Sequence, residues 1–408
     1  MKSLILAAPL MFSLALPPQG VSAVTGTWTL HLSDSWTKDT GERWVSLRLD
    51  HGRGQQYGTS IRLSDLGLDR AGASETWSAR DVRFALRRDA GTVSFEGSFT
   101  NGLGAGTYTF SPSAEYQAAM RQAGRSLSDT DLLRLAIHDV SRAFIASIEA
   151  EGYRDADLDD MVRLRIHGVD ASYIQRLRRA GYDRLPLEDL VRTRIHGATP
   201  EYVQAMSEAG YRGLSVEDLV RTRIHGATPA FLQSVRSAGF EQPAVEDLVK
   251  MRIHGVTPEF IREMREMGYK DLQIEDLVRL RIHGATPSFI RDMRELGFKD
   301  LTLADAVRMR IHGVTGSYVK ELRSLGYSTL TVEDLVKMRI HGVTPEFIRE
   351  LKDLGYGSLD REQLVRMRIH GVDGAFIRDV RAAGFTNMSA EDLIDFSIHG
   401  RRWMARRR

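Results

Sequence analysis

The chain has 408 residues and nearly balances its charges, with 56 lysines and arginines against 54 aspartates and glutamates. A net charge of +2 gives no whole-molecule field that would attract nucleic acid or acidic lipid, and 42% hydrophobic residues are typical of a folded chain. The sequence contains no cysteine, which excludes a disulfide framework and lipid attachment through a cysteine.

Residues 1–23, MKSLILAAPLMFSLALPPQGVSA, are typical of a secretory signal peptide. Lys2 precedes an apolar run of about a dozen residues, and the small residues Val21 and Ala23 offer a cleavage site. The run is short for a membrane span, although an N-terminal membrane anchor is the alternative interpretation. We therefore expect an exported protein, cleaved near Ala23, in a bacterial periplasm or outside the cell.

Residues 24–111 alternate apolar and polar side chains in six segments, which predicts antiparallel strands. Glycine and asparagine separate the last three segments, which we expect to form successive hairpins. About six strands in so short a stretch predict a small β-sandwich or barrel, serving either as a ligand-binding cup or as an adaptor domain. The predicted strands are Gly26–Leu32, Arg43–Asp50, Tyr57–Leu63, Val82–Asp89, Gly91–Phe99 and Gly104–Phe110.

Residues 112–400 repeat the motif Ile-His-Gly at a constant interval of 29 residues. A constant period between about 20 and 50 residues is the signature of a stacked repeat array. The motif histidines are His138, His167, His196, His225, His254, His283, His312, His341, His370 and His399.

Each repeat predicts two short helices joined by a tight turn. In the unit Ala304–Leu330, apolar residues recur at helical spacing up to His312, and Gly313 ends the first helix. Thr315 is the expected N-cap of the second helix. Boxes of the form S/T-x-x-D are expected to cap the first helices. These boxes pair Ser215 with Asp218, Thr302 with Asp305, Thr331 with Asp334 and Ser389 with Asp392.

Helices of about ten residues are marginal alone in water, so the units must be stabilised by stacking. The predicted fold is therefore an α+β multidomain chain, in which a β domain precedes an α-solenoid (superhelix) of about ten helix-turn-helix repeats and an Arg-rich tail, residues 401–408. The expected apolar core of one unit consists of Leu277, Val278, Ile282, Phe289, Ile290, Met293, Leu296, Phe298 and Leu301.

Three positions that recur in the repeats are not explained by caps, turns or the core. These columns are the histidine, the arginine two residues before it, and the basic residue four before it. Metal binding by the histidines is disfavoured, because packed helices lie about 8–10 Å apart whereas zinc–nitrogen bonds measure about 2.0–2.1 Å. The end units keep the histidine but replace the arginine by Ala136 and Ser397.

We therefore expect each histidine to close its own hairpin at the helix C-terminus, with the imidazole bonding exposed carbonyls. Each inner-unit arginine is expected to contact the next unit or a partner. These arginines are Arg165, Arg194, Arg223, Arg252, Arg281, Arg310, Arg339 and Arg368.

Two resemblances follow from the repeat. The segment GVTPEFIREMREMGYKDLQIEDLV (Gly255–Val278) resembles helix-hairpin-helix modules, whose turn N–H groups bind a nucleic-acid phosphate. In this sequence threonine replaces the second glycine of that turn, and the following proline lacks an N–H. The resemblance implies the fold of the hairpin and keeps nucleic-acid binding as an alternative.

The run Arg87–Tyr116, the segment LLRLAIHDVSRAFI (Leu132–Ile145) and the units that follow resemble an uncharacterised family of bacterial repeat proteins. Similar repeats belong to exported proteins and to regions that follow sensor-type integral-membrane metallopeptidases. The resemblance implies an envelope context and supplies no catalytic residue, metal ligand or cofactor.

These observations predict a non-enzymatic exported scaffold whose repeat surface engages a protein or peptide partner in the cell envelope. Second-helix arginines, namely Arg262, Arg291, Arg349 and Arg378, are further candidates for partner contact. The tail RRWMARRR is a candidate for contact with a membrane surface. The β-domain residues His31, His51, Asp50 and Glu96 show no spacing typical of a catalytic site. Nucleic-acid binding through the turns and a purely structural envelope spacer are the alternatives.

Overall fold

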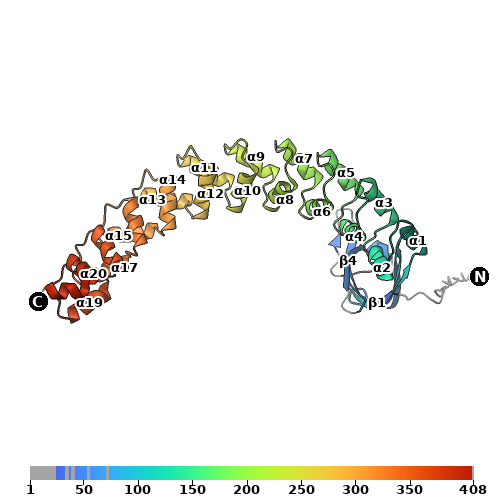
Figure 1. Cartoon of the computed structure of the whole chain (residues 1–408), viewed down its shortest axis with the longest axis horizontal. Coiled ribbons are helices and arrows are strands. Elements are labelled where there is room, and N and C mark those ends of the chain that lie inside the picture. Colours follow the sequence, from blue (N-terminus) through green and yellow to red (C-terminus); the bar gives the residue numbers. More distant parts are fainter. Residues whose placement is uncertain (1–23, 33–35, 38–41, 53–55, 70–72, 407–408) are drawn as a thin grey trace, which may run out of the picture. The chain divides into compact units, whose positions relative to one another are not determined.

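The computed structural model describes residues 24–406 except 33–35, 38–41, 53–55 and 70–72. The predicted signal peptide lies outside the described residues, as do the last two arginines of the tail. The chain divides into two compact units, residues 1–204 and 205–408 (Figure 1), and each is described by itself.

The N-terminal part forms one antiparallel sheet of seven strands. The strand order is β2-β3-β1-β7-β6-β5, and β4 pairs with the remaining side of β3, so that β4 and β5 are the edge strands. The β5–β6 and β6–β7 hairpins confirm the predicted turns. The strands are β1 (Val24–His31), β2 (Trp36–Thr37), β3 (Arg43–Asp50), β4 (Gln56–Arg62), β5 (Ala79–Arg88), β6 (Gly91–Thr100) and β7 (Leu103–Pro112).

The sheet curls around a core centred on Trp28. The indole packs edge-to-face on Phe84 and Phe95, with ring centroids 5.1 and 6.0 Å away, and its Nε1 donates to the carbonyl of Glu96. A β-carbon at Gly97 would lie 2.8 Å from the indole, so glycine makes room for the ring. The 3-10 segment η1 (Leu63–Leu66) contacts both edge strands, and helix α2 packs on β1, β5, β6 and β7.

The rest of the described chain is helical, and the first helix of each repeat before α20 ends at the motif isoleucine. These helices are α2 (Asp129–Ile137), α4 (Leu158–Ile166), α6 (Leu187–Ile195), α8 (Val216–Ile224), α10 (Val245–Ile253), α12 (Ile274–Ile282), α14 (Leu303–Ile311), α16 (Val332–Ile340), α18 (Arg361–Ile369) and α20 (Ala390–Arg406, kinked at Gly400). The second helices are α1 (Ala114–Gln122), α3 (Arg142–Ala150), α5 (Ala171–Arg179), α7 (Pro200–Glu208), α9 (Pro229–Ser237), α11 (Pro258–Glu266), α13 (Pro287–Glu295), α15 (Gly316–Ser324), α17 (Pro345–Asp353) and α19 (Gly374–Ala382).

Within each compact unit, first helices stack on first helices and second helices on second helices, for example α10 on α12 and α11 on α13. This arrangement confirms the predicted α+β architecture with a helical repeat solenoid.

Local capping follows the sequence prediction. The hydroxyl of Thr315 accepts the backbone N–H of Tyr318 at 3.2 Å, and Gly313 takes the left-handed backbone with φ of 70°. Thr331 and Asp334 form a complete capping box. In the other three predicted boxes the hydroxyl likewise accepts the N–H of the aspartate three residues on. The hairpin geometry is therefore encoded locally within each unit.

One predicted core column is wrong. Ile282, which we assigned to the core, is 53% exposed, whereas Leu280 is fully buried. The α-helix turns by about 200° over two residues, so the side chain that follows Leu280 by two positions points away from the core. The same exposure recurs at the end of every first helix after α2.

This contrast predicts different costs for two neighbouring substitutions. Leu280→Ala is expected to lower the free energy of unfolding by about 2–5 kcal/mol, because it opens a cavity in the stack. Ile282→Ala is expected to cost less than about 1 kcal/mol, as is usual for a surface position. Urea unfolding followed by circular dichroism measures both. Equal losses would show that Ile282 is packed in solution.

A candidate binding surface on the repeats and the cleft beside β4

The inner-unit arginines contact the neighbouring repeat. The guanidinium of Arg281 lies 5.3 Å from the ring centroid of Phe260, and its Nε donates to the carbonyl of His254 at 3.5 Å. We expected the following unit, but the contact is with the preceding one, because a repeat pattern does not encode which neighbour a column faces. The same ring contact is made by Arg165, Arg194, Arg252, Arg310, Arg339 and Arg368; Arg223 occupies the equivalent position in α8.

The end units show why the arginine is replaced there. Ser397 Oγ donates to the carbonyl of His370 at 2.5 Å, the equivalent of the carbonyl that Arg252, Arg281 and Arg339 reach with Nε. Ala136 is fully buried on α2, which packs on the sheet. The column therefore contributes to stacking between repeats.

The remaining basic columns also form ion pairs between repeats. In most repeats the basic residue four before the histidine pairs with an acid 25 residues later, as in Lys337–Glu362 at 2.6 Å and Arg366–Glu391 at 2.8 Å, whereas Lys250 pairs with Glu246 on its own helix. Three of the second-helix arginines pair with the preceding repeat, and Arg262 pairs with Glu259 on its own helix. Those three pairs are Arg291–Glu263, Arg349–Glu321 and Arg378–Glu350. Such half-exposed pairs contribute about 1 kcal/mol or less each, and they occupy the arginines that we had considered for partner contact.

The motif histidines lie at the C-cap of the first helix, and the following glycine continues the turn. His254, for example, donates its backbone N–H to the carbonyl of Lys250 at 3.0 Å. Among the described residues, however, none of the ten imidazoles makes a hydrogen bond. The expected bond from imidazole to carbonyl is therefore not formed, and the carbonyl of His254 is bonded by Arg281 of the next repeat.

From the second repeat onward, the isoleucine before each histidine is about half exposed. Nine of these side chains are 47–55% exposed, and Leu103 is the other exposed large apolar residue in the described chain. The position two residues earlier varies between leucine, threonine, methionine and, in the last repeat, the half-buried Phe396, whereas the exposed position is isoleucine in every repeat. We name this column the isoleucine ridge; it consists of Ile166, Ile195, Ile224, Ile253, Ile282, Ile311, Ile340, Ile369 and Ile398.

In the first repeat the same motif is covered by the chain itself. Ile137 is only 3% exposed, because α2 packs on the sheet. Burial lowers the pKa of His138 to about 4, and the nearby charge of Arg134 acts in the same direction. The motif position can therefore be buried against another structural element.

A cleft of about 690 Å³ lies between β4 and the ends of the first helices. Its walls are residues 58–62 of β4, Trp44 of β3, and residues 137–139 and 166–168 at the C-terminal ends of α2 and α4, with Arg194 beyond them. The volume falls in the range of about 300–1,000 Å³ that is usual for ligand sites. We name it the β4 cleft.

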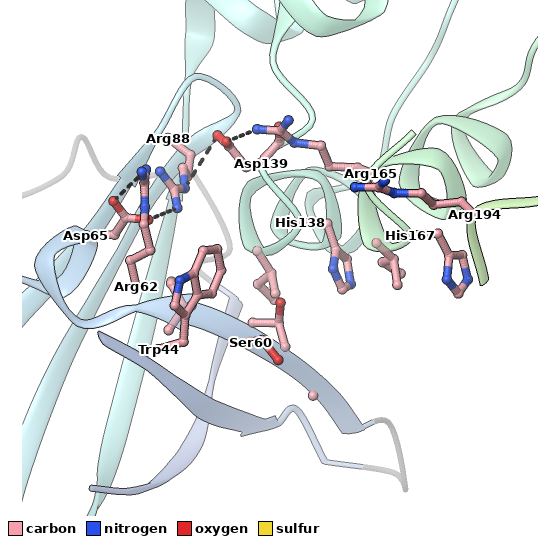
Figure 2. Close-up of a pocket in the computed structure, with 16 residues that line it drawn as sticks. Trp44, Ser60, Arg62, Asp65, Arg88, His138, Asp139, Arg165, His167 and Arg194 are labelled. Atoms are coloured by element: carbon pink, nitrogen blue, oxygen red, sulfur yellow. Dashed lines mark hydrogen bonds and ion pairs between the residues drawn. The ribbon is translucent and has the colours of Figure 1, made fainter. Parts of the chain in front are cut away.

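Ion pairs form a continuous chain along one side of this cleft (Figure 2). Arg62 and Arg88 both bind Asp65, at 3.0 and 2.7 Å, and Arg88 and Arg165 both bind Asp139. Burial alone would raise the pKa of Asp65, but hydrogen bonds from Arg88 and Arg62 outweigh it and hold that pKa below its ordinary value. The chain links the sheet to the first two repeats.

Asp139 is the functional residue that sequence reasoning missed. It replaces the glycine of the motif and keeps the left-handed backbone, with φ of 56°. Asp tolerates this conformation better than most residues, at a cost of about 1–2 kcal/mol. The signal was present in the sequence, because the first motif reads Ile-His-Asp where later ones read Ile-His-Gly.

Comparison with known proteins adds no family: no family model and no curated protein matches this chain. No helix of the described residues is long and apolar enough to cross a membrane. The same residues contain no group of three or more histidine, aspartate or glutamate side chains placed to hold a metal ion.

The covered histidine predicts a pH dependence. The folded-state pKa of His138 is about 4 against an ordinary 6.5, so on acidification the unfolded chain takes up the proton first. Stability should fall as the pH drops from about 6.5 to 4, by up to about 3 kcal/mol at the lower limit. Hydrogen exchange of the α2 amides measures it, and His138→Gln should reduce the loss. His341→Gln, at the same motif position at the end of α16, should retain it; equal behaviour of the two variants would contradict the assignment.

Asp139 predicts a second effect at the same junction. Asp139→Asn keeps a residue that tolerates the left-handed backbone but removes the charge that Arg88 and Arg165 share. We expect a loss of about 1–2 kcal/mol, measured as a lower thermal midpoint and faster proteolysis around α2. Asp139→Gly restores the motif of the later repeats and is the control for backbone strain. A glycine variant more stable than the wild type by about 1–2 kcal/mol, the cost of the left-handed aspartate, would show that the ion pairs contribute nothing net.

Proposed function

We propose that this chain is a non-enzymatic, exported scaffold protein whose repeat surface binds a protein or peptide partner in the cell envelope. The observation that supports the proposal is the isoleucine ridge. Export rests on the sequence of residues 1–23, which is typical of a signal peptide.

The ridge favours binding because about half of each isoleucine side chain stays exposed after the repeats have stacked. The arginine, lysine and glutamate columns contact neighbouring repeats, whereas the isoleucines remain half exposed in every repeat after the first. Contiguous exposed apolar side chains in soluble proteins mark interaction sites. Covering the exposed half of one isoleucine contributes about 1 kcal/mol, so a partner that spans several repeats gains several times that amount.

The spacing of the ridge suits an extended polypeptide. Packed helices lie about 8–10 Å apart, so successive ridge isoleucines recur at about that distance. Three residues of a polyproline II chain cover about 9 Å and make one full turn, which returns the side chain to the same face. A polyproline II peptide with an apolar side chain at every third position therefore matches the repeat.

The hairpin turns are less suited to a nucleic-acid phosphate. The hydroxyl of Thr257 already accepts the N–H of Phe260 at 3.2 Å, and Pro258 has no N–H to donate. Glu259 adds a negative charge at the same helix start. These three residues favour the peptide partner over the alternative. A purely structural spacer needs the stacking columns but has no need of an invariant exposed isoleucine.

A triple substitution on the ridge tests the proposal. Ile253→Ser, Ile282→Ser and Ile340→Ser together are expected to abolish capture of the envelope partner while changing the thermal midpoint little, because surface changes cost about 0.5 kcal/mol or less each. Affinity capture from an extract of the producing cell's envelope, at two salt concentrations, measures the binding.

The control changes exposed residues at the ends of the second helices: Glu266→Ser, Glu295→Ser and Asp353→Ser. This variant should capture the partner as the wild type does. Capture that is insensitive to the ridge but falls steeply with salt, and that recovers nucleic acid, would favour the alternative instead. If no captured protein depends on the ridge, the proposal is wrong.

A further inference from the structure

We infer that the β4 cleft binds an extended acidic peptide segment, which adds to the sheet as a strand on the free edge of β4. The inference rests on the proposed function, and it names the site and the chemistry of the partner.

The first observation is the free edge. Among the described strands, β4 pairs with β3 alone. Five consecutive residues of β4, 58–62, line the cleft. Successive side chains of a strand point to opposite faces, so a wall made of consecutive residues means that the cleft meets the edge of the strand. An exposed edge presents unpaired N–H and C=O groups that template an added strand.

The second observation is the opposite wall. Figure 2 shows His138 and His167 side by side, across the cleft from the strand that carries Ser60. Ile166, the first member of the isoleucine ridge, lines the same wall and is exposed there. A strand laid on β4 would turn alternate side chains towards Ile166, which offers them an apolar contact.

The third observation is the charge of the lining. The cleft contains four arginines and two aspartates, an excess of two positive charges with neutral histidines: Arg62, Arg88, Arg165, Arg194, Asp65 and Asp139. Both aspartates are already shared between two arginines. Arg194 lies 5.2 Å from the ring of Tyr173 and forms no ion pair within 4 Å among the described residues. A carboxylate on the bound segment therefore complements the cleft, whereas a lysine opposes it.

Two labelled octapeptides, TVEVTVEV and TVKVTVKV, test the preference for an acidic peptide and the addition of that peptide as a strand on β4. Fluorescence anisotropy with the full chain without its signal peptide should show binding of the acidic peptide, and binding of the lysine peptide weaker by about tenfold or more. N-methylation of alternate residues blocks strand pairing on one edge only. One methylated set of the acidic peptide should lose binding and the other should keep it. Equal binding of both sets would overturn strand addition.

Matched arginine variants test the site. Arg194→Gln and Arg281→Gln remove the same stacking contact, on Tyr173 and Phe260, so their thermal midpoints should fall alike. Only Arg194→Gln should weaken binding of the acidic peptide, by about tenfold, because Arg194 lines the cleft and Arg281 does not. Equal peptide affinities of the two variants would overturn the assignment of the site.

Two further outcomes would also overturn the inference. Displacement of the peptide by succinate, together with equal binding of both methylated sets, would indicate a site for small anions. A dimer in sedimentation that the acidic peptide dissociates would indicate that β4 pairs with a second copy. The capture experiment with the triple isoleucine variant is independent of these results. If the wild type captures a partner that the triple variant loses, while the octapeptides fail to bind, the proposed function stands and this inference fails.

Discussion

The structure depends on one contact between repeats, in which an arginine bonds a carbonyl at the end of the preceding helix and stacks on an aromatic ring. The contact occurs on both helices: Arg281 reaches His254 in the first-helix column, and Arg294 Nη1 donates to Met267 at 2.7 Å in the second-helix column, 5.0 Å above Tyr269. A helix of nine residues leaves four carbonyls without an intrahelical partner, a large fraction of its backbone. Because the bond comes from the neighbouring repeat, these carbonyls find their partner only when repeats are stacked. The stability of the array is therefore shared between adjacent units.

The contacts between repeats distinguish the residues that build the array from those that do not. The most visible feature of the sequence, the column of histidines, places a C-cap in each repeat, but its imidazoles bond nothing within the described chain. From Ile166 onward, the isoleucine beside each of them stays about half exposed in the stack. An isoleucine that is kept while buried neighbours vary is difficult to explain by folding alone, since Thr193 and Met251 fill equivalent core positions. The motif therefore combines a turn signal with an exposed apolar side chain.

Local features of the fold were predictable from the sequence, and long-range ones were not. The threonine caps and the left-handed glycines follow from nearest-neighbour rules, so Thr315 and Gly313 were placed correctly. Ile282 was misplaced because the last turn of a short helix carries too few residues to fix the phase of its apolar face. The six long strands follow from alternation, but the two-residue β2 has no pattern, and the contact of η1 with both edge strands joins residues far apart in the chain. Of the candidate surface, the arginine column was found and the direction of its contact was not, while the β4 cleft depends on tertiary packing that no local pattern records.

Asp139 connects these observations. A left-handed aspartate is retained at a position where glycine would be unstrained, and its carboxylate is held by Arg88 from the sheet and Arg165 from the next repeat. The sheet therefore docks on the first repeat at the motif, and it buries Ile137 as it does so. The first repeat thus shows within the molecule that the isoleucine at the end of a first helix can be buried against another structural element, while the aspartate beside it holds arginines from both sides.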